Sequence, residues 1–263
     1  MNQSLKKIIL ILVWISIFAV GFYGWQLAPQ GWLGKLRAIG YSVCHQIPSH
    51  SFTIGEHHFP LCTRCMGLYL GALIGLVILF PLGRKSGLPS KPVILLMVLF
   101  VLAWLVDGGN SFFSDLFNRV MLYPSNNTLR LLTGLGMGFS VAITLATLIN
   151  YTVWQTQDQH PLISSIYPLL GMIVIGMAFI WLISTQNEIL MTIFAYLSIG
   201  SIVLLLCLLH MIIWIILFHK ENTYRHWKEL LLVSSAGFLS AVIQITLLDI
   251  LRFTLTGTWE AFI

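Results

Sequence analysis

ILMTIFAYLSIGSIVLLLCLLHMIIWIILF, residues 189–218, decides the class of fold to which this chain belongs. The stretch contains no Asp, Glu, Lys or Arg. A helix of about thirty residues, rising 1.5 Å per residue, would be about 45 Å long, whereas the apolar core of a bilayer is about 30 Å thick. We therefore expect a membrane-spanning helix here that is tilted or that protrudes from the membrane.

The composition of the whole chain supports the same class. Of its 263 residues, 57% are hydrophobic and only 9% are charged, whereas a soluble domain has about 25% charged residues. The net charge of +5 fits basic cytoplasmic loops better than a nucleic-acid partner, because no basic stripe is interleaved with aromatic residues. The lipid bilayer is the expected environment, and no nucleic acid is expected as a partner.

Six further apolar runs are long enough to span a bilayer. They cover residues 8–23, 66–82, 92–106, 129–149, 162–184 and 230–255. Lys6 and Lys7 precede the first run, which is too long for the apolar region of a signal peptide. We predict an all-α helical bundle of about seven spans in one membrane domain, 1–263, with four spans in residues 1–150 and three in 151–263.

Two shorter patterns refine this bundle. Gly67, Gly71 and Gly75 recur at every fourth position of the second span, which predicts a groove where another helix approaches closely. Between the first two spans, Trp32 and Leu36 fall on one helical face together with Ile39 and Val43. This pattern predicts a short interfacial helix just before Cys44.

Sidedness follows from the placement of basic residues. With seven spans and a cytoplasmic N-terminus, the cytoplasmic segments hold Lys6, Lys7, Arg84, Lys85, Lys91, Lys220, Arg225 and Lys228. The outer segments hold Lys35, Arg37, Arg64, Arg119, Arg130 and Arg252. The cytoplasmic set clusters in short loops, so we predict this orientation.

Residues 43–70, VCHQIPSHSFTIGEHHFPLCTRCMGLYL, then lie at the outer side and contain three of the four cysteines. Cys62 and Cys65 can chelate a metal from one turn, with Cys44 as a third ligand. The fourth ligand would be His45 or another histidine of the segment (His50, His57 or His58). Zinc is the expected metal, although thiolates beside Met66 would also suit copper.

The same cysteines allow other readings. Cys62-x-x-Cys65 could be a catalytic dithiol at an oxidising membrane face, with Arg64 favouring a thiolate and Cys44 resolving a mixed disulfide. A structural disulfide or unligated packing thiols are the remaining alternatives.

Ionisable side chains at the same level suggest a polar pocket. We expect ion pairs between Asp107, which closes the third span, and Arg130, and between Asp249 and Arg252. Alternatively, Asp107 acts as a base and Arg130 holds an anion. The further pocket candidates are Arg64, Asn110 and Asn127, and either Asn127 or Thr128 would cap the fourth span.

Four blocks of this sequence resemble the signature of a prokaryotic multi-pass membrane family that is catalogued only as a domain of unknown function. They are Cys44-His45-Gln46-x-Pro48-x-x-Ser51-Phe52, Leu61-Cys62-x-Arg64-Cys65-x-Gly67-x-Tyr69, Asp107-Gly108 and Asn127-x-Leu129-Arg130-x-x-Thr133-Gly134. The resemblance covers roughly residues 41–138 and implies a location in a prokaryotic plasma membrane. It supports the site but implies no reaction.

Our leading hypothesis is a membrane metalloprotein with an outer-face Cys/His zinc site beside a polar pocket. A site closed by four protein ligands would be structural, whereas an open position could activate water against an unknown lipid or peptide-like small-molecule substrate. The alternatives are a membrane thiol-disulfide oxidoreductase that uses Cys62 and Cys65, and a transporter or assembly factor.

Overall fold

The computed structural model describes residues 3–260, and it is a bundle of long helices. The helices are α1 (Gln3–Leu27), α2 (Gly31–Tyr41), α3 (Thr63–Leu79), α4 (Lys91–Phe117), α5 (Asn127–Val153), α6 (Tyr167–Ser184), α7 (Glu188–Leu217) and α8 (Leu231–Thr256). Within the described residues, 7 helices are long and apolar enough to cross a membrane. The predicted all-α class with seven candidate spans is confirmed, and α2 is the short helix between the first two.

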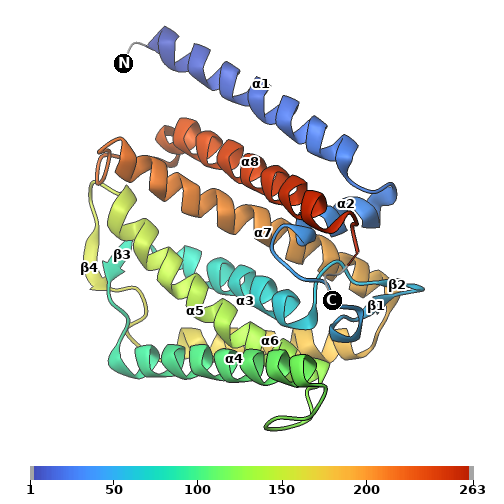
Figure 1. Ribbon diagram of the computed structural model, residues 1–263. Coiled ribbons are helices and arrows are strands. Elements are labelled where there is room, and N and C mark those ends of the chain that lie inside the picture. The colour runs from blue at the N-terminus through green and yellow to red at the C-terminus, as the bar shows by residue number, and fades with distance from the viewer. Residues whose placement is uncertain (1–2, 261–263) are drawn as a thin grey trace.

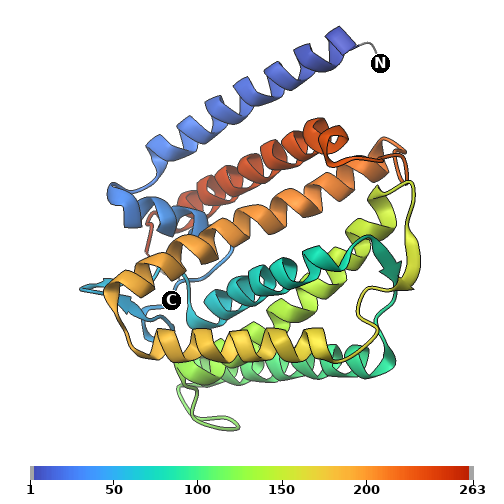
Figure 2. The ribbon, with the colours of Figure 1, turned by 180° about the vertical axis from the view of Figure 1, so that it is seen from behind.

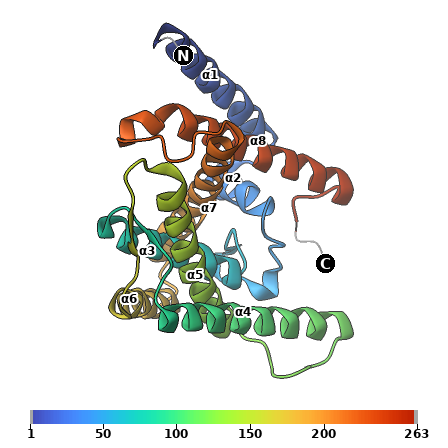
Figure 3. The same ribbon diagram turned by 90° about the vertical axis from the view of Figure 1, so that its left-hand side faces the viewer.

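The long helices lie side by side in layers (Figure 1). α1 is outermost and packs on α8, α8 packs on α7, and the α3–α5 pair lies beyond them with α4 and α6 on its far side, as the view from behind also shows (Figure 2). The view turned by 90° shows α2 between the end of α8 and the α3–α5 pair (Figure 3). The outer surface is apolar, with Phe18 of α1 75% exposed, as expected of side chains that contact lipid.

The closest packing in the bundle is between α3 and α5, and glycines make it possible. A β-carbon at Gly67 would overlap the carbonyl of Leu131, and one at Gly71 would overlap the carbonyl of Leu135. Gly134 of α5 faces the carbonyl of Arg64 in the same way. The predicted glycine groove is therefore confirmed, and it holds the N-terminal ends of α3 and α5 side by side.

Two predicted helix boundaries are wrong. The third span does not stop at Asp107, because α4 continues through Gly108 and Gly109 and ends at Asn118, which has a left-handed backbone (φ 50°). Asp107, which was predicted to end the span, instead lies inside the helix, and its carboxylate accepts hydrogen bonds within the bundle. At the start of α5, the cap is Asn126, whose side chain accepts the N–H of Leu129 at 2.8 Å. Neither Asn127 nor Thr128 caps this helix.

Short strands lie in loops at opposite ends of the bundle (Figure 1). β1 (Thr53–Ile54) and β2 (His57–His58) form an antiparallel hairpin near α2. At the other end, β3 (Lys85–Gly87) pairs in parallel with β4 (Asp158–Pro161). The hairpin end also holds the starts of α3 and α5, so the segments predicted to be on the outer side gather at one end. Membrane sidedness itself stays a prediction.

Candidate metal centre

Two chain segments meet at the hairpin end of the bundle and carry the cysteines. The first leaves α2 through a turn in which the N–H of Cys44 donates to the carbonyl of Gly40 at 2.8 Å. The second is extended at Cys62, which precedes the first turn of α3. Pro60 lies just before it and prevents the helix from starting earlier. The β1–β2 hairpin connects the two segments, so residues far apart in the sequence come together.

Gln46 joins the two segments. Its side-chain Nε2 donates to the carbonyl of Arg37 at 2.8 Å and to that of Pro60 at 2.7 Å, and the residue is only 3% exposed. Gln46 adopts a left-handed backbone (φ 55°), which turns the chain directly after the first pair of candidate ligands. The amide therefore fixes the spacing between Cys44 and Cys62.

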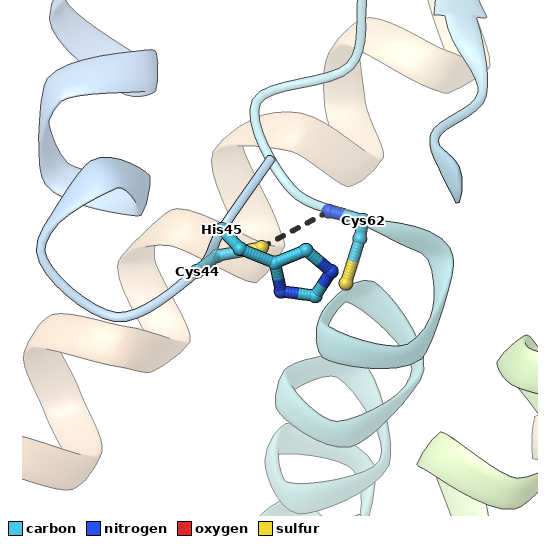
Figure 4. Close-up of side chains that lie close together, drawn as sticks. All are labelled: Cys44, His45 and Cys62. Carbon is cyan, nitrogen blue, oxygen red and sulfur yellow. Dashed lines mark hydrogen bonds between the residues drawn. The ribbon is translucent and has the colours of Figure 1, made fainter. Parts of the chain in front are cut away.

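The side chains of Cys44, His45 and Cys62 form a compact cluster of metal-ligand atoms. The two sulfurs and a ring nitrogen all lie within 4.8 Å of one another. Figure 4 shows the imidazole ring of His45 beside the sulfur of Cys62. The Cys44 sulfur accepts the backbone N–H of Cys62 at 3.3 Å and that of Gln46 at 3.4 Å. Such N–H donors favour the thiolate that a metal requires.

The remaining candidate ligands lie outside this group of three. Cys65 is one turn into α3, partly buried and close enough for its thiol to hydrogen-bond with the other two cysteines. His50 is buried, but its Nε2 lies 3.4 Å from Oδ2 of Asp115. His57 and His58 are exposed on β2. The geometry thus singles out His45 among the four histidines.

The surroundings shift the pKa values of the Cys44 and Cys62 thiols in opposite directions. Hydrogen bonds from the thiols of Cys44 and Cys65 hold the pKa of Cys62 well below its usual value, and the nearby His45 acts in the same direction. The pKa of Cys44 is raised, chiefly because its proton is held against Cys62 and because it is buried. Cys62 is therefore the more acidic of these two thiols. All four cysteines lie in the described part of the chain and are free thiols.

Arg64, in the first turn of α3, forms a largely buried ion pair with Asp107. Nε and Nη2 of Arg64 donate to Oδ2 of Asp107 at 2.9 and 2.6 Å. Tyr123 donates to the other carboxylate oxygen at 3.1 Å and Thr133 to the first at 3.3 Å. The predicted pairing of Asp107 with Arg130 is therefore wrong. Arg64 is the partner because its side chain extends from the start of α3 to α4, where it also reaches Ser111.

Arg130 is buried beside this pair and has only neutral hydrogen-bond partners among the described residues. It donates to Asn127 at 2.9 Å and weakly to Ser111 at 3.4 Å. Its charge, together with burial, lowers the pKa of His50. Asn110 holds the loop after α4, because its side-chain Oδ1 accepts the N–H of Leu122 at 2.9 Å.

The predicted Asp249–Arg252 ion pair is also wrong. The guanidinium of Arg252 donates to backbone carbonyls of the segment after α2. Oδ1 of Asp249 is buried and has no hydrogen-bond partner among the described residues. One turn of helix separates the two residues, but Arg252 extends toward the segment that carries Cys44 and His45 instead.

Four residues that shape the site were not among the predicted site residues, although Gln46 and Thr133 lie in the motif blocks quoted above. Gln46 joins the ligand segments, and Ser111, Tyr123 and Thr133 contact the Arg64–Asp107 pair. Ser111 lies one helical turn after Asp107, so the period of α4 could have found it. Tyr123 lies in an irregular loop, and no pattern in the sequence points to it.

Comparison with known proteins agrees with the fold. Residues 44–144 match the family described as predicted membrane protein (DUF2085). An uncharacterized protein of Methanothermobacter thermautotrophicus is 35% identical over 102 residues, which cover 38% of this chain and 82% of that protein. Uncharacterized protein MJ1492 of Methanocaldococcus jannaschii is 30% identical over 148 residues, covering 52% of this chain and 88% of the relative. No solved structure matches.

The chain therefore belongs to this family of membrane proteins, and the resemblance found in its motifs is confirmed. The matched segment begins at Cys44 and includes Cys62, Arg64, Asp107 and Arg130. It ends within α5. Helices α6, α7 and α8 lie beyond it, so any contribution that they make to the site is outside the segment matched to the family.

Proposed function

We propose that this protein is a membrane metalloprotein that binds zinc through Cys44, His45 and Cys62. The observation that carries the proposal is the convergence of two sulfurs and one imidazole nitrogen within 4.8 Å. Tetrahedral zinc, with bonds of about 2.0 to 2.3 Å, spaces its ligand atoms about 3.5 to 3.8 Å apart. The donors would therefore need to move inward by only about 1 Å, and two backbone N–H groups already donate to the Cys44 sulfur.

The fourth position decides what the metal does. Cys65, one turn along α3, would close the site and make it structural, tying residues 44–62 to the bundle. If Cys65 stays unbound, water or a substrate atom occupies the position, and zinc activates that water for hydrolysis. Arg130, which has no carboxylate partner, would then bind an anionic group of a lipid or small-molecule substrate.

Asp107 is a weak candidate for the base in such a reaction. Its carboxylate accepts hydrogen bonds from Arg64, Tyr123 and Thr133. These donors stabilise the ionised form and reduce its basicity. We therefore propose a structural role for Asp107, which is to hold α4 against the start of α3 beside the metal.

We further propose that the protein lies in a prokaryotic plasma membrane with its N-terminus in the cytoplasm, which places the metal centre on the outer side. One observation supports the orientation, and the other supports the prokaryotic membrane. The basic loops before α4 and after α7 lie at the end of the bundle opposite the cysteines (Figure 1), and both relatives named above come from archaea.

The test is the metal content of detergent-purified protein, measured by elemental mass spectrometry. We expect about one zinc per chain, lost in Cys62→Ser and in His45→Ala. Cys207→Ser is the matched control, because this thiol lies in α7, outside the cluster, and donates to the carbonyl of Ser234. The control should keep its zinc. A wild-type protein without metal, or a Cys62→Ser variant with normal zinc, would refute the proposal.

A second candidate function is thiol-disulfide exchange, favoured by the Cys-x-x-Cys pair at the start of α3 and the lowered pKa of Cys62. The Cys62 thiolate would attack a disulfide of a partner, and Cys65 would displace the reduced partner and leave a Cys62–Cys65 disulfide. Counting free thiols in the same samples separates the two functions. Two thiols that disappear reversibly in an oxidised glutathione buffer, without bound zinc, would favour exchange.

A further inference from the structure

Arg252, near the end of α8, contacts the ligand segment from a helix that lies outside residues 44–144. Its Nη1 donates to the carbonyls of Tyr41 at 2.6 Å and Cys44 at 2.5 Å, and its Nη2 donates to that of His45 at 3.3 Å. The guanidinium also lies 3.8 Å from the centre of the Tyr41 ring. One side chain therefore donates hydrogen bonds to three carbonyls in and just before the turn that carries Cys44 and His45.

Two of these carbonyls belong to Cys44 and His45, the two ligands whose placement is most demanding. Side chains of adjacent residues normally point in different directions, so Cys44 and His45 can face one metal ion only if the backbone between them is held in a particular conformation. The planar fork of a guanidinium presents its N–H donors in a fixed geometry, which the rotating ammonium of a lysine lacks. Gln46 secures the same turn from the other side through the carbonyl of Pro60.

Arg252 can donate to this turn because no ion pair with an acidic side chain of the described residues holds it elsewhere. Asp249, the nearest acid on α8, does not pair with it. The end of α8 is itself tied to α2, since the Tyr41 hydroxyl lies 3.0 Å from Oγ1 of Thr256 and donates to the carbonyl of Thr258 at 2.7 Å. The donor group and the turn therefore form one connected unit.

We infer that Arg252 is a positioning residue of the metal centre, which orients Cys44 and His45 through their backbone carbonyls. This inference rests on the proposed zinc site. It means that α8, which lies beyond the matched segment, takes part in the metal chemistry of this chain. Hydrogen-bonding partners just outside a metal's ligands typically contribute 10- to 100-fold to metal affinity, and we expect an effect of that size here.

The experiment compares Arg252→Gln and Arg252→Lys with the wild-type protein in detergent. Cobalt(II) replaces zinc as a probe, because its absorption bands report the ligand set and geometry, and competition with zinc gives the affinity. We expect both variants to bind zinc about 10- to 100-fold more weakly and to show altered cobalt bands. Arg119→Gln is the control, because it removes the same charge at the same end from an exposed side chain that lies over the ring of Phe117.

The outcomes separate this inference from the proposed function. Normal affinity and normal cobalt bands in both Arg252 variants, with zinc lost in Cys62→Ser, would overturn the role of Arg252 and leave the metal site standing. Unchanged zinc in Cys62→Ser would overturn both. If Arg252→Gln elutes as an aggregate, Arg252→Lys is decisive, because it keeps the charge and the aliphatic stem while losing the fork. An equal loss in Arg119→Gln would assign the effect to charge and refute positioning.

Discussion

Replacing Asp107 by leucine should destabilise the bundle strongly, because it leaves Arg64 buried without a counter-ion. The carboxylate side chain is 1% exposed and that of Arg64 is 12% exposed, with 2.6 Å between Nη2 and Oδ2. Removing one partner of a buried, hydrogen-bonded ion pair costs about 3 to 5 kcal/mol. We expect a loss of this size in the free energy of unfolding of Asp107→Leu, and a similar loss for Arg64→Met.

The double variant tests the cause. When both charges are removed, no ion is left buried, and apolar replacements of buried ion pairs are often close to neutral. The hydroxyls of Tyr123, Thr133 and Ser111 lose partners, so we expect a net cost of about 1 to 2 kcal/mol rather than the sum of the single variants.

The assay is SDS-induced unfolding in mixed micelles, followed by tryptophan fluorescence and circular dichroism. Asp115→Asn is the control on the same helix: its side chain is 51% exposed and pairs only with His50, so it should cost less than about 1 kcal/mol. A cost below about 1 kcal/mol for Asp107→Leu, or a double variant as unstable as the sum of the singles, would refute this account of the pair.

Two further substitutions test how the site is held. Gly71→Leu should prevent α3 from packing on α5, because even a β-carbon would overlap the carbonyl of Leu135. Gly171→Leu is the control, because a β-carbon there would meet no atom of the described residues within 4 Å. The control should elute normally in fluorescence-detected size-exclusion chromatography, and Gly71→Leu should not. Equal behaviour of the two would contradict the close packing. Gln46→Ala should lower the free energy of unfolding by about 1 to 3 kcal/mol, because it leaves the carbonyl of Pro60 buried without its donor. The same variant should lose zinc to a chelator faster. Unchanged stability would show that this hydrogen bond is dispensable.

The spans and their packing surface were predictable because both depend on local composition and spacing. A run such as residues 189–218 must be helical in lipid, since every backbone polar group needs an internal partner. Gly67 and Gly71 indicated a close helix contact before the partner was known. The end of α4 was not predictable, because Asp107 resembles a terminus until Arg64, 43 residues away in the chain, is seen to neutralise it.

The sequence by itself determined the class of protein, the helices and the segment in which ligand-type side chains gather, because these follow from residue type and period. Only the tertiary structure decided which of four histidines joins Cys44 and Cys62, and that Arg252 serves the ligand turn rather than Asp249. Those choices depend on the direction of each side chain after the helices have packed. Contacts across the bundle set that direction, and neighbours in the chain do not.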